Sequence, residues 1–270
     1  MAFDAQSYHK PILAEKCIEF LNVRQGGIYV DCTAGGGGHS ALILEKLSGK
    51  GKLLAFDKDD DAIRFCAKRF EGCGSVELIK SDFKNAARFL AEKGLKPDGI
   101  LMDLGISSHQ IDEKSRGFSY MSRDSALDMR MDRTQSLTAK EILNEYDERK
   151  IFEIVRDYGE EKFASKIAKN IVAFRTVQPI ETTGQLNDII DASIPLSVRK
   201  KGGHPAKRTY QALRIAVNGE LDGLGEAIKE LALSLRVGGR MVVLSFHSLE
   251  DRIVKPVSYT HLTLPTIRLV

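Results

Sequence analysis

The sequence predicts an open α/β fold with a mostly parallel sheet, interrupted by a helical insertion. Short apolar segments rich in β-branched residues alternate with segments of helical periodicity, which is the pattern of βαβ units. This alternation stops after the fourth apolar segment and resumes only near Arg240. A chain of 270 residues is long enough for one large domain that carries a smaller insert.

Five segments are predicted as strands because each is short, apolar and enriched in β-branched or aromatic residues. They are residues 28–30, 52–56, 76–79, 99–102 and 241–246. Between the first strands, residues 40–47 and 59–70 carry apolar side chains at helical spacing, as crossover helices do.

The interval between the fourth and fifth strands is much longer than a plain crossover, which needs only about a dozen residues. It contains four helical patterns, at 139–146, 149–158, 162–174 and 183–192, and no convincing strand. We therefore expect a discontinuous domain formed by 1–109 and 215–255, with a helical insertion domain over 110–214.

Composition excludes several classes of protein. The formal net charge of +3 is too small to indicate polyanion binding by itself. The four cysteines contain no Cys-x-x-Cys pair, so we expect reduced thiols, no metal site and no redox pair. Without a signal-peptide pattern or a run of about 18 apolar residues, the chain is expected to be cytoplasmic and to bind no membrane.

Four successive glycines, Gly35 to Gly38, follow the first strand and open the first helix. Such a loop can adopt positive φ and approach a ligand closely, which predicts a cofactor site. Asp57, at the end of the second strand, fits the acid that contacts a ribose. A dinucleotide fingerprint would require a third glycine where Ser40 stands, so a nicotinamide dehydrogenase is disfavoured and S-adenosylmethionine is favoured.

Polar residues also follow the other strands, at the edge where open α/β sheets bind ligands. Asp82 is equally compatible with a place near an adenine and with a helix cap. Asp103 follows the fourth strand, but the acid-Pro-Pro-aromatic motif of many amino-methyltransferases is absent, so position alone supports it. His247 lies in a polar cluster after the fifth strand, although a lone histidine is more often structural than catalytic.

The insertion contains a segment without acidic residues, between Asp191 and Glu220. Its formal charge of +6 comes from Arg199, Lys200, Lys201, Lys207, Arg208 and Arg214. A nucleic-acid backbone would bind such a segment, and Phe118 and Tyr120 would offer aromatic faces to an unstacked base. The alternative is a solvated basic loop with two core aromatics.

Several motifs together resemble the bacterial 16S ribosomal RNA cytosine N4-methyltransferase family, the MraW or small-subunit methyltransferase H type. The resemblance covers about 250 residues in the same order. It rests on residues 9–13, 31–40, 103–110, 116–121, 127–132, 158–161, 208–214 and 245–255.

The resemblance implies a Rossmann-like class I methyltransferase sheet and transfer of a methyl group from S-adenosylmethionine to a cytosine in the decoding (P-site) region of 16S RNA. It implies that the insertion recognises RNA, with the small ribosomal subunit as partner and a homodimer left open. The cofactor contacts fall, by matching position, on Gly37, Gly38, His39, Asp57, Phe83, Asp103 and Gln110.

The catalytic candidates are Asp103 and His247, either of which could accept a hydrogen bond from the cytosine amine. The RNA-binding candidates are Phe118, Tyr120, Lys200, Lys201, Lys207 and Arg208. Two other functions stay open: a small-molecule methyltransferase, and a non-catalytic RNA-binding module that retains the fold.

The segment 256–270 departs from the family pattern, which continues there into a helix and antiparallel strands. Its composition fits a non-native tail and a genuine edge strand about equally well, because an edge strand tolerates the proline within it. With the sheet incomplete, we expect lower stability than in a relative with the family's usual C-terminus.

Overall fold

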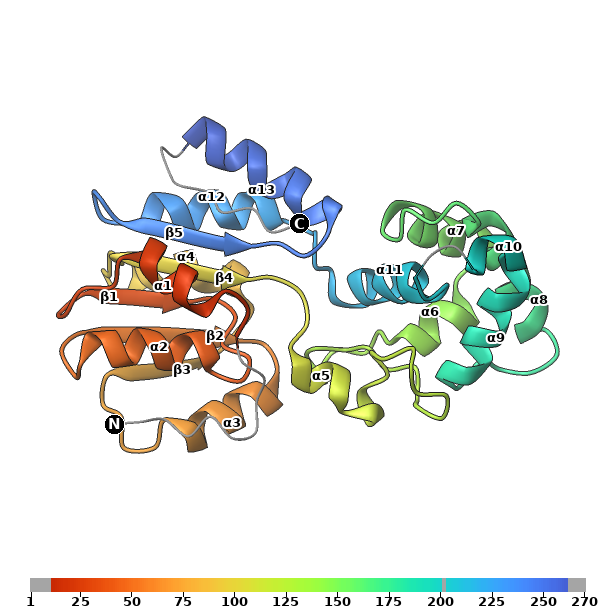
Figure 1. Ribbon diagram of the computed structural model, residues 1–270, viewed down its shortest axis with the longest axis horizontal. Helices are drawn as coiled ribbons and strands as arrows, with labels where there is room; N and C mark the ends of the chain where they lie inside the picture. Colours follow the sequence, from red (N-terminus) through yellow and green to blue (C-terminus); the bar gives the residue numbers. More distant parts are fainter. Residues whose placement is uncertain (1–10, 201–202, 262–270) are drawn as a thin grey trace. The chain divides into compact units, whose positions relative to one another are not determined.

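The computed structural model describes residues 11–200 and 203–261, and these form two compact units (Figure 1). The first unit combines the described residues of Met1–Ser107 and Leu221–Val270. The second unit is Ser108–Glu220. The sequence places the insertion at 110–214, within this second unit.

The first unit is built on a five-stranded parallel sheet with the order β3-β2-β1-β4-β5, which confirms the predicted α/β fold. Its strands are β1 (Ile28–Asp31), β2 (Lys52–Asp57), β3 (Val76–Lys80), β4 (Gly99–Asp103) and β5 (Arg240–Leu244). The strand order reverses between β1 and β4, and this is the position where open α/β sheets bind ligands at their carboxyl ends.

The prediction that the fifth strand extends to Phe246 was wrong. The strand ends at Leu244, and the backbone N–H of Phe246 donates a 2.7 Å hydrogen bond to Oε2 of Glu250. Because this donor is used by a side chain of the following helix, the backbone leaves the sheet two residues earlier than the apolar pattern suggests.

Alternate residues of the strands face opposite sides of the sheet, as the period of two requires. Tyr29, Leu53 and Leu101 belong to one buried cluster, and the neighbouring residues Val30 and Leu54 belong to another. The first cluster includes side chains of α1 (Ala14–Leu21), α2 (Gly38–Leu47) and α3 (Asp60–Arg69). The second includes side chains of α4 (Ala86–Glu92), α12 (Leu224–Ser234) and α13 (Ser248–His261). Helices therefore cover both faces of the sheet.

The edge-strand interpretation of the C-terminal segment is wrong for its first residues. Pro256 to His261 continue α13, which begins at Ser248. Ile253, Val254 and Val257 pack against the second cluster at the i, i+1 and i+4 spacing of one helix face. This packing explains why the segment stays helical through Pro256, and residues 262–270 lie outside the described part of the chain.

The second unit is helical. Its helices are α5 (Ser108–Asp112), α6 (Ala139–Glu145), α7 (Glu148–Asp157), α8 (Ala164–Arg175), α9 (Thr183–Ser193), α10 (Leu196–Arg199) and α11 (Lys207–Asn218). Thr138 and Thr182 begin α6 and α9 with capping boxes. The described residues of this unit contain no strand, only an isolated antiparallel bridge between Ala126 and Thr182.

None of the helices in residues 11–200 and 203–261 combines the length and the apolar character that a membrane-spanning segment requires.

A buried amide holds the irregular segment 117–138 of the second unit against α11. Asn218 accepts a 2.7 Å hydrogen bond from the backbone N–H of Met131 and donates one of 2.7 Å to the carbonyl of Met129. Met129 has a φ of +58°, which an unbranched side chain adopts only at a cost. The amide therefore satisfies two buried backbone groups and fixes a strained turn.

We expect Asn218→Ala to lower the free energy of unfolding by about 2–3 kcal/mol, because it leaves a buried N–H and a buried carbonyl without partners. Urea denaturation measures this change. Gln178→Ala, at an exposed position of the same unit, serves as the control and should change the stability by less than about 0.5 kcal/mol. Equal effects of the two substitutions would contradict the role assigned to Asn218.

Candidate cofactor and active site

The glycine loop folds back onto the sheet between β1 and α2. The backbone N–H of Ala34 donates to the carbonyl of Phe56 at 2.8 Å, and that of Gly37 donates to the carbonyl of Ala34 at 2.7 Å. Gly37 has a φ of +71°, and a Cβ atom there would lie 2.8 Å from the ring of Phe70. Glycine is therefore required at this position by backbone conformation and by space.

Asp57 ends β2 and holds the loop in place. Its Oδ2 accepts a 2.8 Å hydrogen bond from the N–H of Gly35, and its Oδ1 accepts one of 2.8 Å from Asp59. Burial raises the pKa of Asp57 to about 6, although both hydrogen bonds oppose this shift. The prediction that this acid adjoins the glycine loop agrees with the geometry.

Asp31 and Ser40 form a buried pair beneath the loop that sequence reasoning missed. Ser40 donates a 2.6 Å hydrogen bond to Oδ2 of Asp31, and the N–H of Thr33 donates to Oδ1 at 3.1 Å. Burial raises the pKa of Asp31. Ser40 stands where a dinucleotide fold has its third glycine, and its hydroxyl has this structural use. The two residues lie on opposite sides of the glycines, so no local spacing pattern links them.

Asp103 ends β4 beside the loop. Its backbone N–H donates a 2.7 Å hydrogen bond to Oγ1 of Thr33, which joins the ends of β4 and β1 across the position where the strand order reverses. Its Oδ2 lies 3.6 Å from Nδ1 of His39. Its Oδ1 is buried and has no hydrogen-bond partner among the described residues. A buried carboxylate oxygen without a partner is costly, which is typical of a site that receives a ligand.

Burial raises the pKa of Asp103 to about 6, with His39 opposing the shift and the carboxylates of Asp31 and Glu250 adding to it. The site therefore brings acidic groups from β1, β4 and the start of α13 close enough to affect one another. At neutral pH such a group can accept a proton more readily than an exposed aspartate does.

The other cofactor candidates differ in their surroundings. His39 is buried on the first turn of α2, beside Gly38. Phe83 begins a short 3₁₀ helix after β3 and packs, half-buried, against the second core cluster. Asp82 caps that helix by accepting a hydrogen bond from Lys84 at 2.9 Å, which is the structural alternative considered above. Gln110 is buried in α5 and belongs to the second unit.

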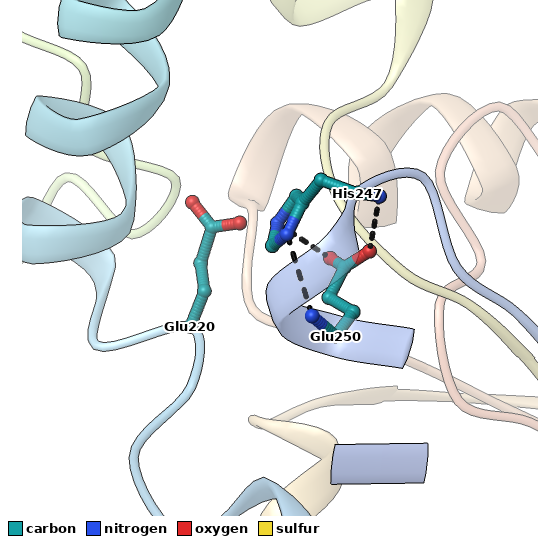
Figure 2. Close-up of side chains that lie close together, drawn as sticks. All are labelled: Glu220, His247 and Glu250. Carbon is teal, nitrogen blue, oxygen red and sulfur yellow. Dashed lines mark hydrogen bonds and ion pairs between the residues drawn. The ribbon is translucent and has the colours of Figure 1, made fainter. Parts of the chain in front are cut away.

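His247 is held by Glu250 at the start of α13 (Figure 2). Its Nε2 lies 3.2 Å from Oε1 of Glu250, and its Nδ1 accepts a 3.4 Å hydrogen bond from the N–H of Glu250. Glu250 also accepts hydrogen bonds from the N–H groups of Phe246 and His247, as a helix-capping acid does. Glu250 therefore contacts both ring nitrogens of His247, although Nε2 is buried and makes no hydrogen bond among the described residues. Sequence reasoning did not single out Glu250, although its contacts lie only three and four residues back in the chain.

Glu220, also drawn in Figure 2, is the last residue of the second unit. Both of its carboxylate oxygens accept 2.8 Å hydrogen bonds from Arg214. Arg199 similarly lies 3.3 Å from Asp191. The formal charge of +6 inferred for this segment is therefore offset at its two ends by the flanking acids.

Of the predicted RNA-binding residues, Lys200, Lys207 and Arg208 are exposed in the second unit, and Lys201 lies outside the described residues. Tyr120 is stacked on His204, with 4.4 Å between ring centroids, and meets Tyr210 edge-on. Phe118 is only 6% exposed, with the Arg116 guanidinium 5.8 Å from its ring centroid. A buried ring offers little surface to a base, so this geometry disfavours Phe118 for stacking.

The raised pKa of Asp57 predicts a specific dependence of stability on pH. The folded protein holds the proton of Asp57 more tightly than the unfolded chain does, so this residue's contribution to stability is present at low pH and is lost as the pH rises through about 6. Asp57→Asn removes the ionisable group, so the variant does not show this loss of stability with rising pH. Between pH 4.5 and 7 the stability of the variant should therefore rise relative to the parent protein by about 2 kcal/mol.

Urea denaturation at several pH values in this range measures the free energy of unfolding of both proteins. The altered hydrogen bonds change the stability of the variant by the same amount at every pH, so they do not affect this comparison. Glu92→Gln, at an exposed position of α4, is the matched control. Parallel pH profiles for Asp57→Asn and the parent would show that the proton of Asp57 is not held as described.

Comparison with known proteins agrees with this geometry. The model of the MraW methylase family matches residues 6–265. Two proteins named ribosomal RNA small subunit methyltransferase H are 52% identical to the chain. The one from Symbiobacterium thermophilum aligns over 92% of this chain and 78% of its own length. The one from Heliobacterium modesticaldum aligns over 92% and 80%.

Among solved structures, an rRNA methylase from Streptococcus thermophilus is 26% identical over 33% of this chain and 53% of its own, with a TM-score of 0.29. A score this low supports no argument, so the assignment rests on the sequence comparisons. They confirm the predicted family and, with it, a methyltransferase that uses S-adenosylmethionine. By the match of nearly its whole length, the chain belongs to the MraW methylase family.

Proposed function

We propose that this protein transfers the methyl group of S-adenosylmethionine to the N4 amine of a cytosine in the decoding (P-site) region of 16S ribosomal RNA. The observation that carries the proposal is Oδ1 of Asp103, which lies beside the glycine loop in a chain of a methylase family and is buried without a partner in the part of the chain that the structure describes. The names of the relatives support small-subunit ribosomal RNA as the substrate.

The residues at the carboxyl ends of β1, β2 and β4 fit the cofactor. Asp57 adjoins the loop and, as a carboxylate, can accept hydrogen bonds from ribose hydroxyls. Gly35 and Gly37 adopt positive φ and have no side chain, so a ligand can approach the loop backbone closely. Gly38, His39 and Phe83 of the same unit complete this set of proposed contacts. The cofactor supplies an electrophilic methyl group on a positively charged sulfur.

The chemistry of the acceptor defines what the protein must contribute. A cytosine amine is a poor nucleophile because its lone pair is delocalised into the ring, so holding the amine in line with the methyl group is the main requirement. The free Oδ1 of Asp103 can accept a hydrogen bond from the amine and then take up its surplus proton. His247 is the second candidate: its Nε2 is also buried without a hydrogen bond among the described residues, but Oε1 of Glu250 lies 3.2 Å from it.

We propose that the second unit recognises the RNA. Its exposed Lys200, Lys207 and Arg208 can contact phosphates, and Lys201 belongs to the same basic segment. Tyr120 is the aromatic candidate that remains, with one face of its ring stacked on His204. The target base has to leave its stack before it can be methylated, and aromatic side chains favour such a base.

Labelled S-adenosylmethionine and isolated small ribosomal subunits test this function. We expect label in the 16S RNA, and mass spectrometry of the nucleosides should show N4-methylcytidine. A small-molecule methyltransferase would leave the RNA unlabelled. A non-catalytic RNA-binding module would bind the subunits without transferring any label.

Asp103→Asn is the variant that tests the proposed proton acceptor. We expect it to lower kcat by at least about 100-fold, the usual contribution of a positioned acid or base, while the protein stays folded. Glu92→Gln, on the exposed side of α4, should retain full activity. Full turnover by Asp103→Asn would remove Asp103 from the mechanism without affecting the proposed substrate.

The basic segment should contribute to the salt dependence of RNA binding. Each phosphate contact contributes about 0.7–0.9 to the slope of log affinity against log salt concentration. The double variant Lys200→Ala/Lys207→Ala should therefore reduce this slope for 16S RNA binding by about 1.5. Lys166→Ala, an exposed lysine on α8, is the control. An unchanged slope in the double variant would show that RNA binds elsewhere.

A further inference from the structure

His39 makes two contacts that determine where its protons lie. Its ring is buried on the first turn of α2. Nε2 lies 3.2 Å from the carbonyl oxygen of Ile12, and Nδ1 lies 3.6 Å from Oδ2 of Asp103. Turning the ring by 180° would place carbon atoms at both positions and would lose both contacts.

The contact with Ile12 fixes one proton. A carbonyl oxygen can only accept a hydrogen bond, so Nε2 carries a proton. In a neutral imidazole, Nδ1 would then present its lone pair to Asp103. A lone pair facing an ionised carboxylate is repulsive, and the contact is favourable only when the pair holds a second proton.

That second proton can lie on His39, which gives an ion pair, or on Asp103, which gives two neutral groups. The net charge of the pair is zero in both arrangements, and it becomes −1 when the proton leaves. The two residues therefore share this proton.

The charged and titratable groups around the pair favour its protonated form. Asp31 at the end of β1 and Glu250 at the start of α13 both raise the pKa of Asp103. The buried thiol of Cys17 on α1 faces the same group, and its own pKa is raised to about 11 by burial and, secondarily, by Asp103. None of these three residues supplies a positive charge that would expel the proton.

We propose that the His39–Asp103 pair stores one proton in the cofactor-free protein and releases it to solvent when S-adenosylmethionine binds. This inference rests on the proposed function, which places the cofactor at this edge of the sheet. The sulfonium carries a positive charge, and a partly buried site strengthens its attraction to the deprotonated pair. S-adenosylhomocysteine, the product, has the same adenosine, amino and carboxylate groups but no charge on sulfur.

His39 thereby acts as a positioning residue for Asp103 and as a sensor of the charge on the cofactor. The deprotonated pair favours the methyl donor over the spent product. It also leaves Asp103 ionised when the donor is bound, which is the form that can accept a proton from the cytosine amine.

Isothermal titration calorimetry of the full-length protein with each of the two compounds tests the proposal. Titrations in two buffers of different ionisation enthalpy, at several pH values from 5.5 to 8, count the protons released. We expect S-adenosylmethionine to release up to about one proton more than S-adenosylhomocysteine. Where the cofactor-free pair still holds its proton, the Kd of S-adenosylmethionine should fall by up to about tenfold for each unit by which the pH rises, and the Kd of S-adenosylhomocysteine should change less.

His39→Gln is the informative variant, because its amide can still donate to the carbonyl of Ile12 but cannot titrate. It should abolish the difference in proton release between the two compounds. His204→Gln, an exposed histidine of the second unit, should retain that difference.

The outcomes are distinguishable. Failure of the parent protein to bind S-adenosylmethionine would overturn the proposed function. Binding with equal proton release for both compounds, at every pH, would overturn this inference and leave the function standing. Because the comparison of the two compounds on the parent protein is decisive by itself, the test does not depend on correct folding of His39→Gln.

Discussion

The hydrogen bond from the backbone N–H of Asp103 to Oγ1 of Thr33 joins the ends of β4 and β1, and the arrangement of the site depends on it. Strand order reverses at this position, and the neighbouring helices cover opposite faces of the sheet: α2, which follows β1, packs in the first cluster, and α12, which precedes β5, packs in the second. The separation opens the edge to a ligand. β1 and β4 are also paired in the sheet, and the N–H of Cys32 donates to the carbonyl of Leu101 at 2.8 Å, so the Thr33 contact extends this pairing past the strand ends where the aspartates lie.

Three aspartates at this edge are buried to different extents and satisfied in different ways. Asp31 has a partner on each oxygen and supports the loop from below. Asp57 also uses both oxygens, but at the end of the strand where a ribose would lie. Asp103 alone keeps one buried oxygen without a partner among the described residues. The cost of burying these acids is therefore offset least at Asp103, the residue that we propose as the proton acceptor.

In the second unit, the feature that needs explanation is how buried backbone groups outside regular elements find hydrogen-bond partners. Its segment between α5 and α6 is long and irregular, and buried backbone groups there need partners. Asn218 of α11 supplies two of these partners, and the buried guanidinium of Arg116 donates to the carbonyls of Arg130 and Met131. Polar side chains thus replace the backbone ladder that a regular element would provide. They leave the exposed Lys200, directly after α10, and the exposed Lys207 and Arg208 of α11 on a defined scaffold.

The sequence by itself determined the α/β class, the positions of the strands and the family, because each depends on local periodicity or on residues close together in the chain. Asp57 and the glycine loop were found for the same reason. The tertiary structure decided what no local pattern links: the pairing of Asp31 with Ser40 and the contact of His39 with Asp103. It also decided that Phe118 is buried and that Pro256 continues a helix, since both follow from packing against neighbours that no local pattern reveals.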